Sequence, residues 1–204
     1  MAVKIGVLAL QGAFREHINA IKKCGCEAVE IKFAGQLENI DGLIIPGGES
    51  TTMVKLIDKY NFKPALDRFH KMGIPLFGTC AGLILLASKV DNLGFCLGYI
   101  DIEVDRNAYG RQVESFEMPV KLNGSYFNSK DDFTAVFIRA PKIIKASEKV
   151  QVLSSMDGSP VLVRQGSVLV CSFHPELTDD LRIHMFFAGM AKKSLNAANP
   201  DILI

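Results

Sequence analysis

Cys80 is the residue whose neighbours are most typical of covalent catalysis. It lies between Gly78 and Gly82 in the pattern G-x-C-x-G, after an apolar run that predicts a strand and before one that predicts a helix. The same pattern with serine forms a nucleophile elbow, in which small flanking residues allow a strained turn that projects the nucleophile above a sheet. A helix N-terminus at that point favours the thiolate form of cysteine. The pattern therefore predicts a nucleophile, although a buried structural cysteine is the alternative.

His174 and Glu176 are candidates for the base that a thiolate nucleophile needs. They lie in the string Ser-Phe-His-Pro-Glu, directly after a predicted strand at residues 167–173. Pro175 restricts the backbone between them, so we expect both side chains on one side of a rigid turn, with the carboxylate orienting the imidazole. A His-x-Glu string alone is common in surface loops. Its significance here comes from the presence of Cys80.

The third candidate element is the string Pro-Gly-Gly-Glu-Ser at residues 46–50. Two glycines after a buried strand allow backbone N–H groups to turn outward and face an oxyanion as its charge develops. An ordinary strand-to-helix turn and a phosphate-binding loop are the alternatives. The phosphate-loop patterns G-x-x-x-x-G-K-[ST] and G-x-G-x-x-G are absent from the sequence, which favours the oxyanion interpretation.

The hydrophobic pattern predicts the elements that must position these residues. In the first half, apolar runs predict strands at residues 3–10, 27–33, 41–46 and 74–77, and helical periodicity predicts helices at 13–24, 51–60, 62–72 and 83–89. Gly25 is expected to end the first helix, and Thr51 and Thr52 are expected to cap the second. Alternating strands and helices indicate a mostly parallel sheet.

The second half of the chain is richer in strands. We expect them at residues 99–104, 111–120, 134–138, 150–153, 160–164 and 167–173, with a strand-like Tyr126, an exposed loop at 123–132 and a closing helix at 179–195. The expected fold is α/β in three layers: a mostly parallel central sheet flanked by helices, with an added antiparallel β layer.

Composition limits the class of protein. The chain has 204 residues, of which 49% are hydrophobic and 22% charged, so we expect a single domain spanning 1–204 around one core. A net charge of +1 argues against nucleic-acid binding, and no apolar stretch is long enough for a membrane span or a signal sequence. Five irregularly spaced cysteines indicate a reducing compartment, so we expect a cytoplasmic protein.

The remaining histidines and cysteines show no functional pattern. The four histidines have no metal-binding spacing, so no metal site is expected. His17, His70 and His184 are assigned to packing or the surface. The other cysteines are assigned to small, buried apolar positions: Cys24, Cys26, Cys96 and Cys171.

The three candidate motifs, PGGES, GTCAG and HPE, resemble those of class I (triad) glutamine amidotransferases. Within that class the chain is similar to the glutaminase subunits of pyridoxal 5'-phosphate synthases. The strings that carry this resemblance are Leu8–Gly12, Pro46–Thr51, Arg106–Gln112, Phe137–Pro141 and Phe173–Glu176. The resemblance extends from Val3 to the last helix.

The resemblance implies hydrolysis of L-glutamine to glutamate and ammonia through a glutamyl thioester. It implies a triad of Cys80, His174 and Glu176, and oxyanion donors at the backbone N–H groups of Gly48 and Ala81. The substrate-binding residues that it implies are Gly47, Gly48, Glu49, Arg106, Ile138 and Arg139. It implies no metal and no organic cofactor. The implied partner is a separate barrel-type pyridoxal 5'-phosphate synthase subunit in a large hetero-oligomer, with Gln11 and Gly12 near the site or facing that partner.

One departure from the amidotransferase pattern limits the substrate site. Many relatives continue as G-x-C-x-G-x-Q, whereas this chain has Leu83 and Ile84. The polar contact made by that glutamine must then come from other residues. The glutaminase of another complex, such as imidazole glycerol phosphate synthase, is an alternative that Leu83-Ile84 and the R-N-x-Y-G-R-Q string disfavour. A non-catalytic redox or stress-response module is a second alternative, which the presence of both His174 and Glu176 disfavours.

Overall fold

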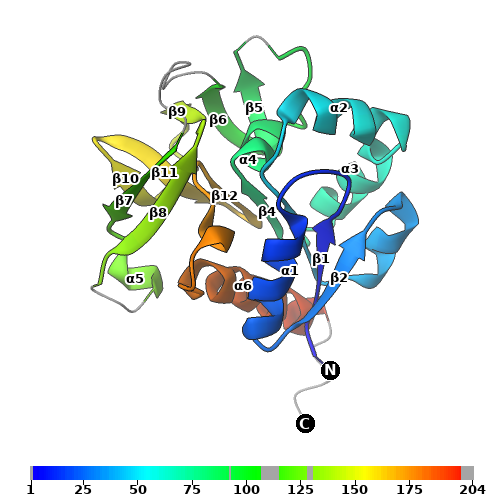
Figure 1. The fold of residues 1–204 in the computed structure, drawn as a ribbon. Coiled ribbons are helices and arrows are strands. Elements are labelled where there is room, and N and C mark those ends of the chain that lie inside the picture. The colour runs from blue at the N-terminus through cyan, green and yellow to red at the C-terminus, as the bar shows by residue number, and fades with distance from the viewer. Residues whose placement is uncertain (1, 92, 107–114, 128–130, 199–204) are drawn as a thin grey trace.

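A seven-stranded sheet forms the centre of the molecule. The computed structural model describes residues 2–91, 93–106, 115–127 and 131–198 (Figure 1). The strands, in spatial order, are β10 (Gln151–Met156), β11 (Ser159–Gln165), β12 (Val168–Cys171), β4 (Leu76–Thr79), β3 (Gly42–Ile45), β1 (Lys4–Leu8) and β2 (Glu27–Ile31). The run from β12 to β2 is parallel, and β10 and β11 extend it antiparallel.

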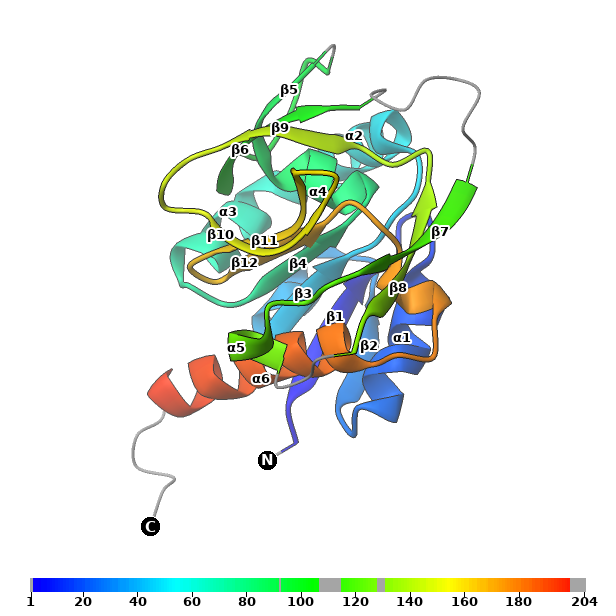
Figure 2. The ribbon, with the colours of Figure 1, turned by 90° about the vertical axis from the view of Figure 1, so that its left-hand side faces the viewer.

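Helices cover both faces of this sheet, which gives the three layers seen in Figure 2. One face carries α1 (Phe14–Lys23) and α6 (Arg182–Ala198), and the other carries α2 (Ser50–Lys59), α3 (Lys63–Lys71) and α4 (Ala81–Leu86). Two small sheets are added: β5 (Ala87–Val90), β6 (Ile100–Asp105) and β9 (Lys142–Ala146), and the hairpin β7 (Ser115–Val120) with β8 (Phe133–Ile138). The expected α/β fold with an added antiparallel layer is confirmed.

Successive residues of each central strand point into different cores. In β3, Leu43 and Ile45 join the cluster beneath α2, α3 and α4, whereas Ile44 joins the cluster beneath α1 and α6. All three side chains are fully buried. This alternation is the geometric consequence of strand pleating, and it explains why the central strands appear in the sequence as continuous apolar runs. None of the described helices is long and apolar enough to cross a membrane.

The functional candidates follow the carboxyl ends of three adjacent parallel strands. Thr79 ends β4 and precedes Cys80, and Cys171 ends β12 shortly before His174. Ile45 ends β3 and precedes residues 46–49, the glycine loop. Since parallel neighbours end at the same edge of a sheet, the topology brings the three motifs together.

Several predicted elements differ from the structure. The helix predicted at residues 83–89 begins at Ala81 and ends at Leu86, and the next four residues form β5 beside β6. The backbone carbonyls of Leu86 and Ala87 accept hydrogen bonds from Tyr99 and Gly98, a tertiary pairing that periodicity does not record. The strands β5 and β9 and the 3-10 helix η1 (Ala34–Asn39) were not predicted.

The assignment of Tyr126 to a strand is wrong, because Tyr126 lies in the short helix α5 (Gly124–Phe127). The side chain of Asn123 accepts a hydrogen bond from the Ser125 N–H (3.1 Å), and this local bond favours a helical turn where a loop was expected. Residues 128–130 of that loop and 111–114 of the strand predicted at 111–120 lie outside the described residues.

The elbow is so tight that Gly82 tolerates no side chain. A Cβ at Gly82 would lie 2.0 Å from the carbonyl oxygen of Ile45, whereas a Cβ at Gly189 in α6 would meet nothing within 4 Å. We expect Gly82→Ala to lower the free energy of unfolding by about 1–3 kcal/mol through overpacking. Gly189→Ala, the matched helical control, should leave it unchanged or raise it by about 1 kcal/mol. Urea unfolding measures both, and equal effects would contradict the expectation.

Candidate active site

Cys80 occupies a strained turn between β4 and α4. Its backbone has φ 49° and ψ −102°, an unfavourable conformation for a residue with a side chain. The Cys80 N–H donates to the carbonyl of Cys171 (2.9 Å), and the thiol lies 3.8 Å from the carbonyl oxygen of Ile138. Cys80 as a whole residue is 7% exposed, at the N-terminus of α4. This is the geometry expected of a nucleophile elbow.

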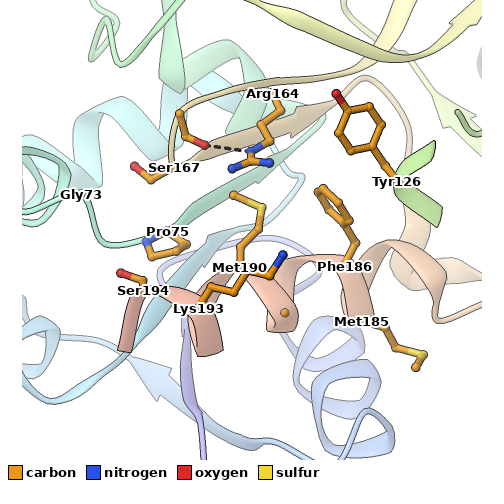
Figure 3. Close-up of a pocket in the computed structure, with 12 residues that line it drawn as sticks. Gly73, Pro75, Tyr126, Arg164, Ser167, Met185, Phe186, Met190, Lys193 and Ser194 are labelled. Carbon is orange, nitrogen blue, oxygen red and sulfur yellow. Dashed lines mark hydrogen bonds between the residues drawn. The ribbon is translucent and has the colours of Figure 1, made fainter. Parts of the chain in front are cut away.

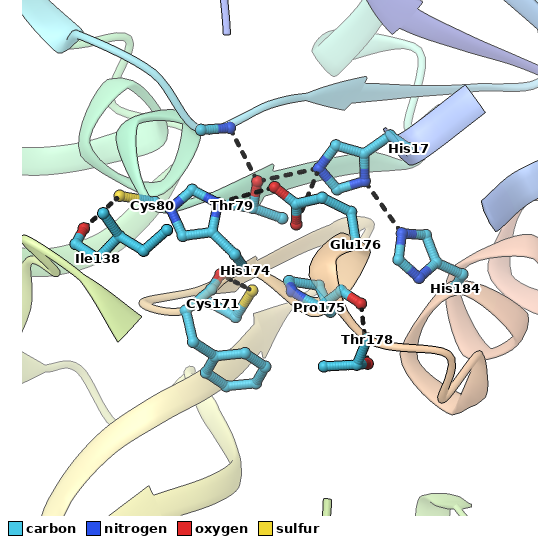
Figure 4. A network of polar contacts seen from close by, with 12 residues as sticks. His17, Thr79, Cys80, Ile138, Cys171, His174, Pro175, Glu176, Thr178 and His184 are labelled. Atoms are coloured by element: carbon cyan, nitrogen blue, oxygen red, sulfur yellow. Dashed lines mark hydrogen bonds and ion pairs between the residues drawn. The ribbon is translucent and has the colours of Figure 1, made fainter. Parts of the chain in front are cut away.

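His174 is held between Cys80 and Glu176 (Figure 4). The backbone N–H of His174 donates to the carbonyl of Val136 in β8 (2.8 Å), which anchors the backbone at this point. On the side chain, Nδ1 lies 2.8 Å from Oε1 of Glu176. Pro175 begins the 3-10 helix η2 (Pro175–Leu177), the rigid turn that brings the two side chains onto one side. The imidazole therefore has one nitrogen occupied by the carboxylate and the other available to the thiol.

The shifted pKa values of His174 and Glu176 favour an ion pair between these two side chains. Burial lowers the pKa of His174, but the hydrogen bonds to Cys80 and Glu176 outweigh it and raise this pKa to about 10. Burial opposes ionisation of Glu176 as well, yet its interactions with His17 and His174 hold its pKa below the usual value. At neutral pH the site therefore has an imidazolium beside Cys80 and an ionised carboxylate behind it.

The glycine loop packs directly against His174. A Cβ at Gly47 would lie 2.3 Å from Cε1 of the imidazole, so only glycine fits there. The Gly47 N–H donates to the hydroxyl of Thr79 (3.0 Å), so this N–H group points into the protein rather than toward a substrate. Of the two glycines, Gly48 lines the cavity beside Cys80.

A cavity of about 390 Å³ opens above the thiol. Its lining residues are Gln11, Gly48, Glu49, Ser50, Cys80, Ile84, Arg106, Ile138, Arg139 and His174. Most of the predicted site residues are thus brought together, whereas Gly47, Ala81 and Glu176 are not among the residues that line the cavity. Arg106 is described, but residues 107–112 of its motif lie outside the described residues. A larger cavity of about 490 Å³ along α6, lined in part by Arg164 and Met190, contains none of the predicted residues (Figure 3).

The capping of α2 corrects one expectation. Glu49, rather than Thr51 or Thr52, is the N-cap, and its carboxylate accepts hydrogen bonds from the N–H groups of Thr52 (2.7 Å) and Thr51 (3.3 Å). Hydrogen bonding from Thr51 is the largest cause that lowers the Glu49 pKa to about 2. Gln11 accepts from the Glu49 N–H (2.9 Å). Glu49 therefore uses its carboxylate to hold the start of α2 at the rim of the cavity.

Sequence reasoning missed three polar residues behind the triad. His17 and His184 were assigned to packing or the surface; both are fully buried, which agrees with packing, but His17 also lies 3.3 Å from Oε2 of Glu176. Thr79 contacts His17 (3.1 Å). Their positions in α1, α6 and β4 carry no shared local signal, so only the packing reveals them. By contrast, His70 stacks on Tyr99 with ring centroids 4.3 Å apart, which is a packing role.

Two further expectations concern metals and the other cysteines. Within the described ranges, no group of three or more His, Cys, Asp or Glu side chains is arranged to hold a metal ion. The cysteine thiols are free. The prediction of buried positions is wrong for Cys24, Cys26 and Cys96, which are partly exposed. Cys171 is fully buried, and burial raises its pKa well above the usual value. Such a thiol is inert, in keeping with its assignment to the core.

The chain is similar over most of its length to known glutamine amidotransferases. Residues 7–193 match the model of the SNO glutamine amidotransferase family. The chain is 53% identical over 195 residues to the pyridoxal 5'-phosphate synthase subunit PdxT of Geobacillus sp. (strain WCH70), covering 94% of this chain and 98% of that relative. The PdxT subunit of Thermotoga petrophila is 50% identical, with 93% and 100% covered. A crystal structure of a glutamine amidotransferase superposes with a TM-score of 0.85 at 46% identity, with 92% and 98% covered.

The stability contributed by His174 should depend on pH. The folded protein holds the His174 proton up to about pH 10, whereas the ordinary pKa, which applies to the unfolded chain, is 6.5. The contribution is therefore complete below pH 6.5 and is lost as the pH rises through about 10. We expect urea unfolding to show that the wild type loses at least about 1 kcal/mol more than His174→Asn between pH 7 and pH 10. Parallel losses in the two proteins would contradict the raised pKa.

Proposed function

The chain belongs to the SNO glutamine amidotransferase family, and from that premise we propose that it hydrolyses L-glutamine to L-glutamate and ammonia for a pyridoxal 5'-phosphate synthase. The observation that carries the proposal is the arrangement of Cys80 on its elbow beside His174, whose other nitrogen lies 2.8 Å from Glu176. Relatives that are 53% and 50% identical to this chain, over 94% and 93% of its length, are named as PdxT subunits of pyridoxal 5'-phosphate synthase.

In the first half of the reaction the Cys80 thiolate attacks the side-chain carboxamide carbon of glutamine. A C–S bond forms, and the carbonyl oxygen becomes an oxyanion, which we assign to the backbone N–H groups of Gly48 and Ala81. His174 then donates the proton on its Nε2 to the leaving nitrogen. The C–N bond breaks, ammonia departs, and a glutamyl thioester remains.

In the second half His174, now neutral, takes a proton from water. The resulting hydroxide adds to the thioester carbonyl, the C–S bond breaks, and glutamate leaves while Cys80 returns to the thiolate. Glu176 keeps the Nδ1 hydrogen of His174 in place throughout and stabilises each imidazolium that forms. The raised pKa of His174, about 10, suits the stage at which it must carry a proton beside a thiolate.

Substrate recognition in this proposal relies on the charged rim of the cavity. Arg106 and Arg139 line it and are suited to the α-carboxylate of glutamine, with Ile138 beside the thiol. Ile84, which stands where many relatives have glutamine, gives one wall an apolar surface against the methylene groups. Glu49 contributes to substrate recognition indirectly, because its carboxylate caps α2 and so stabilises the glycine loop at the rim of the cavity.

The ammonia must reach an acceptor on another chain. We propose that the partner is a barrel-type synthase subunit, with many copies of each chain in the complex, and that residues 1–204 act as a single glutaminase domain. The names of the relatives, which describe synthase subunits, support this assignment. The cytoplasmic location expected from the sequence stays a prediction.

Replacing the nucleophile should abolish the chemistry. We expect Cys80→Ala to lower ammonia release from glutamine at least about 10³-fold, because no thioester can form, while folding and partner binding persist. Ammonia release is measured for the chain alone and with a pyridoxal 5'-phosphate synthase subunit. Cys96→Ala, at a partly exposed cysteine outside the site, is the matched control. Activity that survives in Cys80→Ala would overturn the assignment of the nucleophile, and activity that ignores the synthase subunit would indicate another amidotransferase complex.

Removing the arginine at the rim should weaken substrate binding. We expect Arg106→Gln to raise KM for glutamine at least about tenfold with a smaller change in kcat, because a charge-assisted contact to the α-carboxylate is lost. Arg164→Gln is the control, since the Arg164 side chain donates to the carbonyl of Gly166 and lines the other cavity. Steady-state kinetics with the synthase subunit present decide the matter: an unchanged KM would remove Arg106 from the substrate site.

A further inference from the structure

Glu176 meets a second imidazole on the side turned away from His174. Nε2 of His17, from α1, lies 3.3 Å from Oε2 of Glu176 and 3.1 Å from the hydroxyl oxygen of Thr79. Nδ1 of His17 lies 3.0 Å from Nε2 of His184 in α6. Figure 4 shows these side chains in one continuous network with Glu176 and His174. The reaction described above uses neither His17 nor His184.

The carboxylate determines which nitrogen of His17 carries the hydrogen. An ionised oxygen only accepts hydrogen bonds and repels a nitrogen lone pair, so Nε2 carries the hydrogen and faces both Thr79 and Glu176. Nδ1 is then an acceptor, and Nε2–H of His184 donates to it. Burial lowers the pKa of His17 and lowers that of His184 to about 3, so both rings are neutral, as this arrangement requires.

The contact from His17 is the main polar contact that the described residues offer to Oε2 of Glu176. Oε2 of Glu176 makes no hydrogen bond of good geometry to the described residues, and both Glu176 and His17 have side chains with 0% exposure. An ionised oxygen without a partner is costly to bury, so the hydrogen on His17 Nε2 is the group that stabilises this oxygen. The opposite oxygen, Oε1, remains directed at His174.

Thr79 connects the same imidazole to the glycine loop. Its hydroxyl oxygen contacts Nε2 of His17 (3.1 Å) and accepts from the Gly47 N–H (3.0 Å). The Gly47 backbone in turn lies against the His174 ring, where a Cβ would be only 2.3 Å from Cε1. The buried His17 side chain therefore contacts Glu176, which orients the base His174, and Thr79, which holds the glycine loop.

We propose that His17 is a positioning residue of the glutaminase, which uses its Nε2–H to orient the Glu176 carboxylate toward His174 and, through Thr79, to hold the Gly47 peptide. His17 does not touch the reacting atoms. This inference rests on the proposed function for its kinetic test, and the geometry of the His174–Glu176 pair gives a second readout that needs no substrate.

Two amide variants of His17 test its two ring nitrogens separately. In His17→Gln the amide nitrogen reaches the position of Nε2, whereas in His17→Asn it reaches only the position of Nδ1, which faces His184. With the synthase subunit present, we expect His17→Asn to lower kcat about 10- to 100-fold, with KM for glutamine within about twofold of wild type. His17→Gln should restore kcat to within about threefold of wild type. His70→Gln and His70→Asn, at the histidine stacked on Tyr99, are the matched controls and should leave both constants unchanged.

The proposal is overturned if His17→Asn keeps the wild-type kcat, if the two variants lose activity equally, or if only KM changes. Should His17→Asn fail to fold in a thermal unfolding assay, Thr79→Val tests the next link in the network. Thr79→Val removes the hydroxyl at nearly constant volume and should lower kcat by a similar factor. Thr79→Ser keeps the hydroxyl and should not. Equal activity in these two variants would also overturn the proposal.

Proton NMR of the resting protein separates this inference from the proposed function. The hydrogen between Nδ1 of His174 and Glu176 is identified by its loss in His174→Asn. Its chemical shift should be the same in wild type and His17→Gln and displaced in His17→Asn. A shift common to all three proteins overturns the positioning role. If wild type with the synthase subunit releases no ammonia, the proposed function fails while this comparison still decides the role of His17.

Discussion

Glu176 carries a charge in a place with almost no access to water, and the site is organised around that constraint. Its side chain has 0% exposure, so its two oxygens must be stabilised by protein groups. Oε1 is paired with Nδ1 of His174 at 2.8 Å, and Oε2 contacts Nε2 of His17 at 3.3 Å. Together with the hydrogen bond to Cys80, the first contact raises the pKa of His174, and the second contact selects the tautomer of His17.

The strain at Cys80 and the packing around it result from the same close approach of elements. The elbow requires β4 to turn into α4 within one residue, and this turn places Gly82 against the carbonyl of Ile45 at the end of β3. The glycine loop that follows β3 is thereby brought against His174. The nucleophile is therefore positioned by backbone contacts between adjacent strands, the base by a backbone hydrogen bond to Val136 in β8, and the glycine loop by the Thr79 hydroxyl, and these contacts preorganise the site.

Local patterns were sufficient for much of this protein and insufficient at identifiable places. Alternating apolar runs predicted the central strands, because those strands are buried on both faces. The helix predicted at residues 83–89 was wrong at its end because its last residues pair with β6, and Tyr126 was wrong because Asn123 favours a helical turn. Thr51 and Thr52 were expected to cap α2, but Glu49 precedes them at the N-cap position, and its carboxylate accepts hydrogen bonds from their N–H groups.

The sequence by itself determined the nucleophile candidate, the His-Pro-Glu turn and the glycine loop, since each depends on neighbouring residues whose spacing is visible in the chain. It also determined the alternation that makes the sheet parallel. Only the tertiary structure decided that His17, Thr79 and His184 join the triad, and that the Gly47 N–H points inward to Thr79. These contacts join side chains up to 167 positions apart in the chain. Their existence depends on how α1 and α6 pack beneath the end of β4, which no local pattern encodes.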